Sequence, residues 1–274
     1  MPARPTAKPT PEHDSRAALP RRFPSYSQDD TIGPQRLQED VLPKTERALR
    51  LKQVPFLAQL SAPALERIAQ TCSWREFPAA SQILDYQERS TDVYFLISGK
   101  VRIIIYSYDG RQVVFTDLGS GAMFGEIAAI DRKPRSASVE AIEDCTVASL
   151  TSQQFENLML QEPLLALATL RHVTTDMRRL SDRVLEFSTL AVRNRIHAEL
   201  LRLANIAGRE GAGSLLQPAP SLSEIASRIS THREAVSREI SRLTDIGLLQ
   251  REGRNMRVMD ASRLAALVAE AKGE

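Results

Sequence analysis

The sequence has few cysteines and no long apolar run. Its two cysteines, Cys72 and Cys145, lie far apart and form no CxxC pair, which argues against a disulfide framework or a cysteine zinc site. No segment approaches the roughly 18 consecutive apolar residues that a membrane-spanning helix needs. The opening residues MPARPTAKPTPEHDSR lack the apolar core of a secretory signal. We therefore expect a cytoplasmic protein without a membrane partner.

Histidines are scarce and the net charge is small. The net charge of +2 means that nucleic-acid binding would need a local basic patch. No histidine occurs between Trp74 and Leu150, where a metal-dependent cupin enzyme would need its ligands, and no nucleophile–base arrangement is found. We therefore expect a protein that is not an enzyme. We also expect no metal site, because the four histidines are dispersed along the chain: His13, His172, His197 and His232.

The first half of the chain changes character twice. Residues 1–45 are rich in Pro, Arg, Ser and Asp and lack a hydrophobic period, so we predict a disordered tail. The stretch VPFLAQLSAPALERIAQ, residues 54–70, follows as a short predicted helix. Its apolar side would carry Leu57, Leu60, Leu65 and Ile68.

From Trp74 to about Leu150 the sequence predicts a β-roll or jelly roll. The stretch VYFLISGKVRIIIYSYDGRQVVFTDL holds two apolar, β-branched strands separated by Asp109–Gly110, a strong hairpin signal. Further glycines at Gly119 and Gly121 suit tight turns. Many short strands at such spacing favour an all-β roll.

A long helix is predicted over residues 163–191. Its apolar residues recur every three or four positions, which is typical of the heptad seam of a coiled-coil homodimer. The alternative is a helix packed on its own domain, which normally needs a wider apolar stripe. The seam comprises Leu170, Val173, Met177, Leu180, Val184, Phe187 and Ala191.

Residues 192–274 predict a winged helix-turn-helix. After the loop GREGAGSLLQPAP, two S/T-x-x-E capping boxes, Ser221–Glu224 and Thr231–Glu234, mark two helix starts. The second helix has one polar face that would fit a DNA major groove, where an arginine reads guanine and a glutamate reads cytosine. This face carries Arg233, Glu234, Ser237, Arg238 and Ser241.

A basic wing is predicted after Gly247. The stretch LLQREGRNMRVMD indicates two strands around a turn that would bring Arg251, Arg254 or Arg257 to DNA phosphates. From Arg228 to Arg257 there are seven arginines and four acidic residues, a local net charge of +3. Taken singly, Glu234 could be only a helix cap and Arg238 only its ion-pair partner.

Two motifs give the chain a resemblance to the Crp–Fnr family over about residues 50–262. FGEIAAIDRKPRSASV is similar to the phosphate-binding cassette of cyclic-nucleotide-binding domains, and THREAVSREISRL is similar to the family's recognition helix. The resemblance implies an α+β chain in four parts: a tail (1–45), a cyclic-nucleotide-binding roll (46–162), a dimerisation helix (163–191) and the DNA-binding domain (192–274).

The resemblance also assigns roles within the cassette. Arg135 would offer forked donors to the ligand's phosphate, and Glu126 would accept from the ribose 2′-hydroxyl. Buried charges of this kind need partners, whereas an ordinary surface ion pair is the simpler alternative. The remaining donors would be the Ser136 hydroxyl and backbone N–H groups around Gly125, Ile127 and Ala137.

The nucleobase and the effector stay open. In the family, polar residues of the dimer helix sense the base, and here Leu180 and Ser181 occupy those positions, with Thr174 and Thr175 two turns earlier. Cyclic AMP and cyclic GMP both fit Ser136. Cyclic di-GMP, a metabolite, or no effector at all are the alternatives. An iron–sulfur cluster is disfavoured because the tail has no cysteine, and a channel or kinase regulator because a DNA reader is present.

The expected function is therefore a homodimeric, effector-dependent transcription regulator. A cyclic nucleotide would orient the two recognition helices on a palindromic operator with half-sites about 34 Å apart. The implied partners are double-stranded DNA, the cyclic nucleotide, a second copy of the chain and RNA polymerase.

Overall fold

The structure is a computed structural model that describes residues 43–106, 112–209, 211 and 213–273. Residues 1–42 of the predicted tail and the predicted Asp109–Gly110 turn lie outside the described residues. Within the described ranges, no helix combines the length and the apolar character that crossing a bilayer requires.

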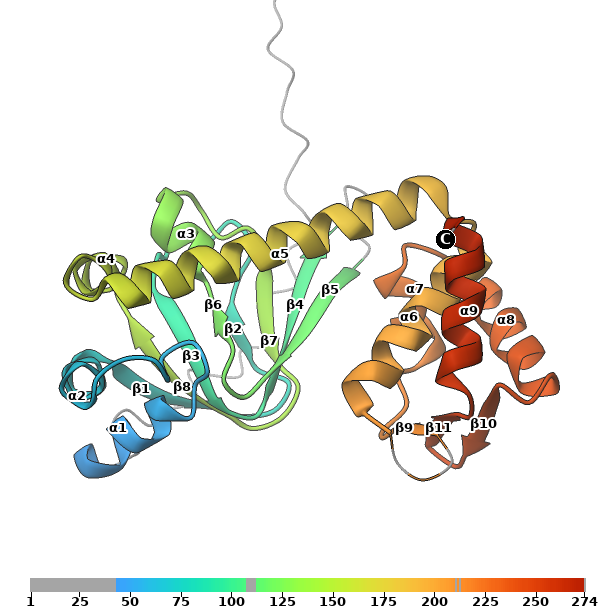
Figure 1. The fold of residues 1–274 in the computed structure, drawn as a ribbon. Coiled ribbons are helices and arrows are strands. Elements are labelled where there is room, and N and C mark those ends of the chain that lie inside the picture. Colours follow the sequence, from blue (N-terminus) through green and yellow to red (C-terminus); the bar gives the residue numbers. More distant parts are fainter. Residues whose placement is uncertain (1–42, 107–111, 210, 212, 274) are drawn as a thin grey trace, which may run out of the picture. The chain divides into compact units, whose positions relative to one another are not determined.

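Two four-stranded antiparallel sheets form the roll (Figure 1). One sheet has the order β1-β8-β3-β6 and the other β2-β7-β4-β5. Leu96 and Val147 of the first sheet pack with Val101 and Val139 of the second, so apolar side chains of both sheets fill the space between them. The strands are β1 (Ser73–Phe77), β2 (Gln82–Leu84), β3 (Val93–Ser98), β4 (Lys100–Tyr106), β5 (Gln112–Gly119), β6 (Met123–Phe124), β7 (Ser138–Ala141) and β8 (Cys145–Leu150).

The predicted β character of this block is confirmed. β4 and β5 pair antiparallel from Lys100–Gly119 to Tyr106–Gln112, as the hairpin prediction requires. The two strands twist with a register shift between Ile103 and Ile104.

The helix predicted over residues 54–70 is wrong in extent. Helix α2 (Ala62–Thr71) starts only after Ser61, whose side chain accepts a hydrogen bond from the Ala64 N–H at 3.3 Å. Ser61 and the following Pro63 favour a helix start at this point. A separate helix, α1 (Lys44–Lys52), overlaps the end of the predicted tail. The four apolar residues of the prediction are nevertheless all buried in one cluster.

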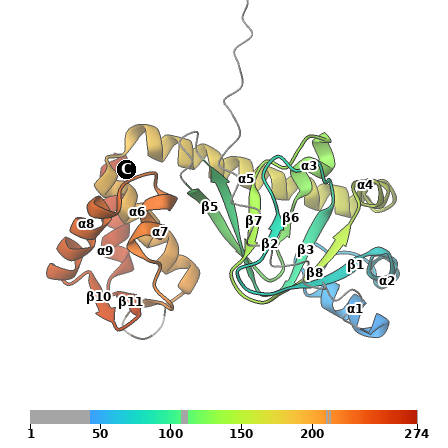
Figure 2. The same cartoon turned by 180° about the vertical axis from the view of Figure 1, so that it is seen from behind.

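Three helices follow or interrupt the roll: α3 (Glu126–Asp131), α4 (Ser152–Gln161) and α5 (Pro163–Thr189). The 27 residues of α5 make it about 40 Å long. It runs past α3, as both views show (Figures 1 and 2). Leu165 and Thr169 are its buried residues, so only its first turns are anchored in the core of the roll.

The C-terminal domain has a three-stranded sheet of order β10-β11-β9 and a helical core. Val236, Ile240 and Leu243 of α8 are fully buried against Ile196 and Ile225. The elements are α6 (Val192–Ala207), β9 (Ser214–Leu216), α7 (Leu222–Arg228), α8 (Arg233–Asp245), β10 (Leu249–Glu252), β11 (Asn255–Val258) and α9 (Ala261–Lys272).

Two local predictions in this domain need correction. Ser221 caps α7 by accepting from the Glu224 N–H at 3.1 Å, but α8 begins after His232 rather than Thr231 and has no side-chain cap. Ser230, in the turn between the two helices, has the left-handed conformation with φ of 52°. Part of the predicted glycine- and proline-rich loop is strand β9, which pairs with β11 through Met256–Leu216.

Candidate functional site

Arg135 lies in the interior of the roll. Its side chain is 2% exposed, Nε donates to Ser90 Oγ at 2.9 Å, and Nη1 donates to the Gly125 carbonyl at 2.9 Å. The guanidinium also lies over the ring of Tyr94, 5.8 Å from its centroid. Nη2 is buried and has no hydrogen-bond partner among the described residues. An anion placed there would satisfy this donor and the charge.

Gly125 makes the close approach to Arg135 possible. It has φ of 81°, and a Cβ at this position would lie 2.8 Å from the Asp92 carbonyl and 2.9 Å from Arg135 Nη1. Only glycine adopts this conformation without strain and leaves that space open. The backbone of the cassette is fixed further by the Arg135 N–H, which donates to the Glu88 carbonyl at 2.8 Å.

Glu126, the first residue of α3, is 8% exposed. Burial raises the pKa of its carboxyl, while the nearby charges of His172 and Arg135 oppose that shift. Over the part of the chain that the structure describes, no ion pair joins Glu126 to Arg135. The simpler interpretation, a surface ion pair, is therefore wrong, because both groups are buried and each has other neighbours.

The other predicted cassette residues lie at the edge of this arrangement. Ser136 is exposed, Ala137 is half-buried, and the side chain of Ile127 is 50% exposed. The role of each toward a ligand remains a prediction.

The structure places two unpredicted side chains of α5 next to Glu126. Ligating atoms of Glu126, His172 and Asp176 all lie within 4.8 Å of one another. The sequence does not predict this neighbourhood, because His172 and Asp176 lie about 50 positions from Glu126 and come near it only where α5 passes α3. Their i, i+4 spacing places them on one face of the helix, but it does not say what that face meets.

The predicted base-sensing residues, Leu180 and Ser181, lie on α5 and have no bond to the cassette among the described residues. Ser181 is exposed, and its hydroxyl donates to the Met177 carbonyl at 3.0 Å. Leu180 is 39% exposed. No hydrogen bond in the described chain links either residue to the cassette. The role of Ser181 toward a base remains a prediction.

The predicted DNA-reading face lies on α8. Arg233, Glu234 and Arg238 are exposed and Ser237 is half-buried, on the side opposite the buried apolar residues. Glu234 forms no ion pair with Arg238 among the described residues, so both remain available to a partner. In the wing, Arg254 is exposed between β10 and β11.

The basic patch is smaller than the seven arginines of the sequence suggest. Arg228 is 6% exposed and bound to Asp117 of β5, so it is a structural residue. Arg257 pairs with Glu252 at 2.6 Å. Arg242 pairs with Glu239, also at 2.6 Å. The arginines without an ion pair to a described residue are Arg233, Arg238, Arg251 and Arg254.

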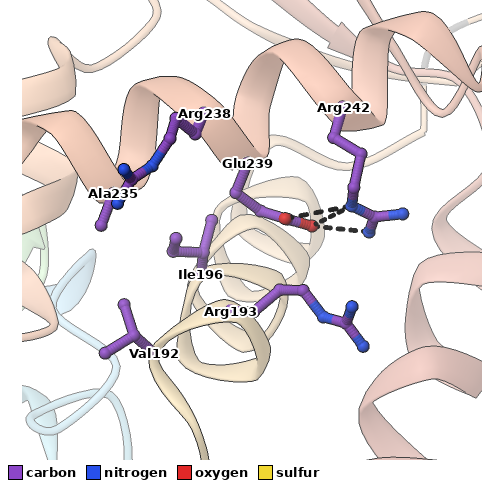
Figure 3. Close-up of a pocket in the computed structure, with 7 residues that line it drawn as sticks. All are labelled: Val192, Arg193, Ile196, Ala235, Arg238, Glu239 and Arg242. Atoms are coloured by element: carbon purple, nitrogen blue, oxygen red, sulfur yellow. Dashed lines mark hydrogen bonds and ion pairs between the residues drawn. The ribbon is translucent and has the colours of Figure 1, made fainter.

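A pocket of about 300 Å³ lies between α6 and α8 (Figure 3). Arg242 is held by Glu239 on one side of it, whereas Arg193 and Arg238 extend without a bond to another residue drawn there (Figure 3). These two cations give the pocket a positive rim beside the reading face. Its lining comprises Val192, Arg193, Ile196, Ala235, Arg238, Glu239 and Arg242.

Comparison with known proteins identifies both domains. Residues 74–162 match the cyclic nucleotide-binding domain, and residues 194–267 match the Crp-like helix-turn-helix domain. The chain belongs to the Crp–Fnr family. It is a transcription regulator with a cyclic-nucleotide-binding roll and a DNA-binding domain, as the sequence motifs predict.

Relatives and solved structures of this family cover most of the chain. A CRP-like cAMP-activated global transcriptional regulator of Mycobacterium tuberculosis is 27% identical over 191 residues, which are 69% of this chain and 85% of the relative. The cAMP-activated global transcriptional regulator Vfr of Pseudomonas aeruginosa is 27% identical over 196 residues, 70% of this chain and 92% of the relative. A CRP-family transcriptional regulator from Thermus thermophilus superposes with a TM-score of 0.60 at 25% identity, covering 71% of this chain and 96% of that one.

Proposed function

We propose that this Crp–Fnr regulator binds a cyclic mononucleotide, cyclic AMP or cyclic GMP, in its roll. The observation that carries the proposal is the buried guanidinium of Arg135, whose Nη2 has no partner among the described residues. A cyclic phosphodiester is a compact anion that would accept a hydrogen bond from this unsatisfied donor. The names of the relatives, which are cAMP-activated, support the same ligand class.

The remaining contacts follow from the cassette. Glu126 is the acceptor proposed for the ribose hydroxyl, and the Ser136 hydroxyl is a further donor to the phosphate. Backbone N–H groups of Gly125, Ile127 and Ala137 complete the proposed phosphate contacts. Ser181 is the proposed base contact. The proposal assigns a ligand to the roll, with no resident organic cofactor and no catalytic role.

The proposed DNA partner is a palindromic operator. Arg233, Glu234, Ser237 and Arg238 would read base edges in a major groove, and Arg254 would contact a phosphate. Two copies related by a two-fold axis would present these helices to half-sites about 34 Å apart. The ligand and the operator must then strengthen each other's binding by the same factor.

The proposed dimer is supported by the exposed apolar side of α5. Leu170, Met177 and Val184 are 63%, 62% and 64% exposed, which is unusual for large apolar residues recurring at heptad spacing. A second copy would cover them. In the same proposal the dimer acts in the cytoplasm, where its DNA lies, with RNA polymerase as a further protein partner.

Calorimetry on matched arginine variants tests the ligand assignment. Arg135→Gln should bind cyclic AMP or cyclic GMP at least about 30-fold more weakly, because a charge-assisted donor pair is worth about 2–3 kcal/mol. Arg132→Gln is the control, since Arg132 lies on the same loop but bonds to Glu156 at the surface. Unchanged affinity in Arg135→Gln would refute the site.

The same titration separates the alternative effectors. Wild-type protein that ignores both cyclic mononucleotides but binds cyclic di-GMP would replace the proposed ligand. Protein that binds none of the three, yet binds its operator, would favour a metabolite or no effector.

A further inference from the structure

Three side chains of types that bind metal ions lie close together on α5 and α3. Figure 1 shows α5 passing α3. His172 and Asp176 come from α5, and Glu126 is the first residue of α3. One ligating atom from each lies within 4.8 Å of the other two. One nitrogen and two carboxylate oxygens from two helices thus lie close together.

The spacing of the two α5 residues suits a shared ion. His172 Nε2 lies 3.5 Å from Asp176 Oδ2. Two ligands bound tetrahedrally at 2.0–2.2 Å from zinc are about 3.4 Å apart. Residues at i and i+4 project from the same face of a helix, so both side chains can reach the same ion.

Neighbouring side chains orient the ligands. The ring of Phe56 contacts that of His172 edge to face, with centroids 6.3 Å apart and planes at 73°. Arg179 donates to Asp176 Oδ1 at 3.1 Å, which leaves Oδ2 facing His172. Side chains that hold metal ligands in this way are a normal part of metal sites.

The charges around Glu126 also favour a cation. Glu126 and Asp176 are two carboxylates in close proximity, a repulsive arrangement in a partly buried setting. Arg135 bonds to Ser90 and Gly125 rather than to Glu126. A divalent cation between the carboxylates would remove the repulsion.

We propose that Glu126, His172 and Asp176 bind one first-row divalent transition-metal ion, with zinc as the representative probe. A ligand set of imidazole and carboxylates suits such an ion better than an all-oxygen set would, and three protein ligands leave a fourth position for water. Because Glu126 is also the acceptor proposed for the ribose, metal and cyclic nucleotide would affect each other's binding. The site itself follows from the geometry of the three residues and does not depend on the proposed function.

Equilibrium dialysis of zinc with the tag-free full-length protein tests the proposal. Wild type should bind one zinc per protomer, and His172→Ala and Asp176→Asn should each bind it at least about tenfold more weakly. His232→Ala is the matched control, because His232 is exposed in the other domain and should not contribute. The cysteines are poor competitors, since burial raises the pKa of Cys72 to about 12 and Cys145 is 2% exposed.

Two outcomes would overturn the site: wild type that binds no zinc, and zinc binding that survives in both α5 variants with melting temperatures like that of wild type. Binding of magnesium in preference to zinc would overturn the transition-metal assignment. Arg135→Gln keeps all three metal ligands and should retain zinc. Loss of nucleotide binding in that variant therefore tests the proposed function, while the α5 variants test the metal site.

Discussion

Two oxygen atoms of the protein itself hold the Arg135 side chain in place. Ser90 and the Gly125 carbonyl accept hydrogen bonds from two of its nitrogens, and the guanidinium lies over the ring of Tyr94. Burial lowers the pKa of this guanidinium below its ordinary value. An arginine side chain nevertheless stays protonated in proteins at neutral pH. Because this side chain is already held in place, the protein loses less side-chain entropy when a ligand binds.

Gly125→Ala should damage both stability and ligand binding. The new Cβ would meet Arg135 Nη1 and the Asp92 carbonyl at under 3 Å, in a backbone conformation that costs alanine about 1 kcal/mol by itself. We expect a total loss of about 2–3 kcal/mol in the free energy of unfolding and weaker cyclic-nucleotide binding. Urea denaturation and calorimetry measure the two effects.

Gly247→Ala is the control for strain alone. Gly247 has φ of 73° but nothing within 4 Å of the position of its Cβ. It should lose only about 1 kcal/mol. Equal losses in the two variants would mean that the approach of Gly125 to Arg135 has no energetic weight.

His197 should make the C-terminal domain sensitive to acid. It is 1% exposed, and its Nε2 lies 2.6 Å from Glu239 Oε1. Burial lowers the pKa of His197 below 6.5, despite Glu239, and the charges of Arg242 and Arg193 add to the lowering. The unfolded chain therefore binds the proton more readily, and stability falls as the pH decreases below about 6.5.

Thermal unfolding between pH 7.5 and 5 measures this effect. Wild type should lose several degrees of melting temperature in the C-terminal transition, and His197→Gln should lose less over the same range. His232→Gln, which alters an exposed histidine, should follow wild type. Identical slopes for all three proteins would exclude His197 as the titrating group.

Glu239 contributes to acid sensitivity at lower pH. Burial acts to raise the pKa of its carboxyl, but the bonds to Arg242 and His197 lower it overall, so a further loss of stability follows nearer pH 4.

For single residues, the sequence predicts which charged side chains are unusual, but not the partners that lie far away in the chain. Glu126 and Arg135 stand out because charged residues interrupt a run of small and apolar ones, and both are buried. Arg228 was misassigned to the DNA surface because its partner, Asp117, is 111 positions away. No pattern in the sequence predicts an ion pair between residues so far apart.

At the scale of elements, helix α8 and the wing divide the proposed DNA contacts. Arg238 lies on the reading face of α8, whereas Arg254 lies at the tip between β10 and β11. The first would contact a base and the second a phosphate. These contacts differ in how they depend on DNA sequence and on salt.

Arg238→Ala should cost about 1–3 kcal/mol on an operator obtained by in vitro selection and much less on unrelated DNA. Arg254→Ala should weaken binding to both DNAs and reduce the salt slope by about 1. Fluorescence anisotropy at several salt concentrations measures both effects. A loss that is the same on every DNA for Arg238→Ala would argue against base readout by that residue.

The elements themselves were predicted well where a pattern is long and poorly where it is short. The heptad period of α5 and the alternating strands of the roll extend over many residues, and both elements are found. Strand β9 has three residues and forms because β11 offers a free edge, so its own sequence contains little signal. The start of α8 lies one residue later than predicted, after a turn in which Ser230 has an unusual backbone conformation.

At the scale of the whole molecule, the apolar side of α5 predicts self-association. Val184→Glu would place a carboxylate in the proposed seam, next to its own copy across the two-fold axis, and should weaken the dimer at least about 100-fold. Thr175→Glu adds the same charge at an exposed position away from the seam and should leave the dimer unchanged. Sedimentation of both variants over a range of concentrations measures the dissociation constant. A Val184→Glu protein as dimeric as wild type would place the interface elsewhere.

The proposed dimer through α5 would also tie regulation to gene dosage. Below the dissociation constant of the proposed dimer, the amount of paired chain rises with the square of the amount of chain made. Halving expression would then remove about three quarters of the DNA-binding species, with the effector level unchanged. A cell could therefore silence such a regulator by modest changes in its synthesis or turnover, well before the effector itself runs out.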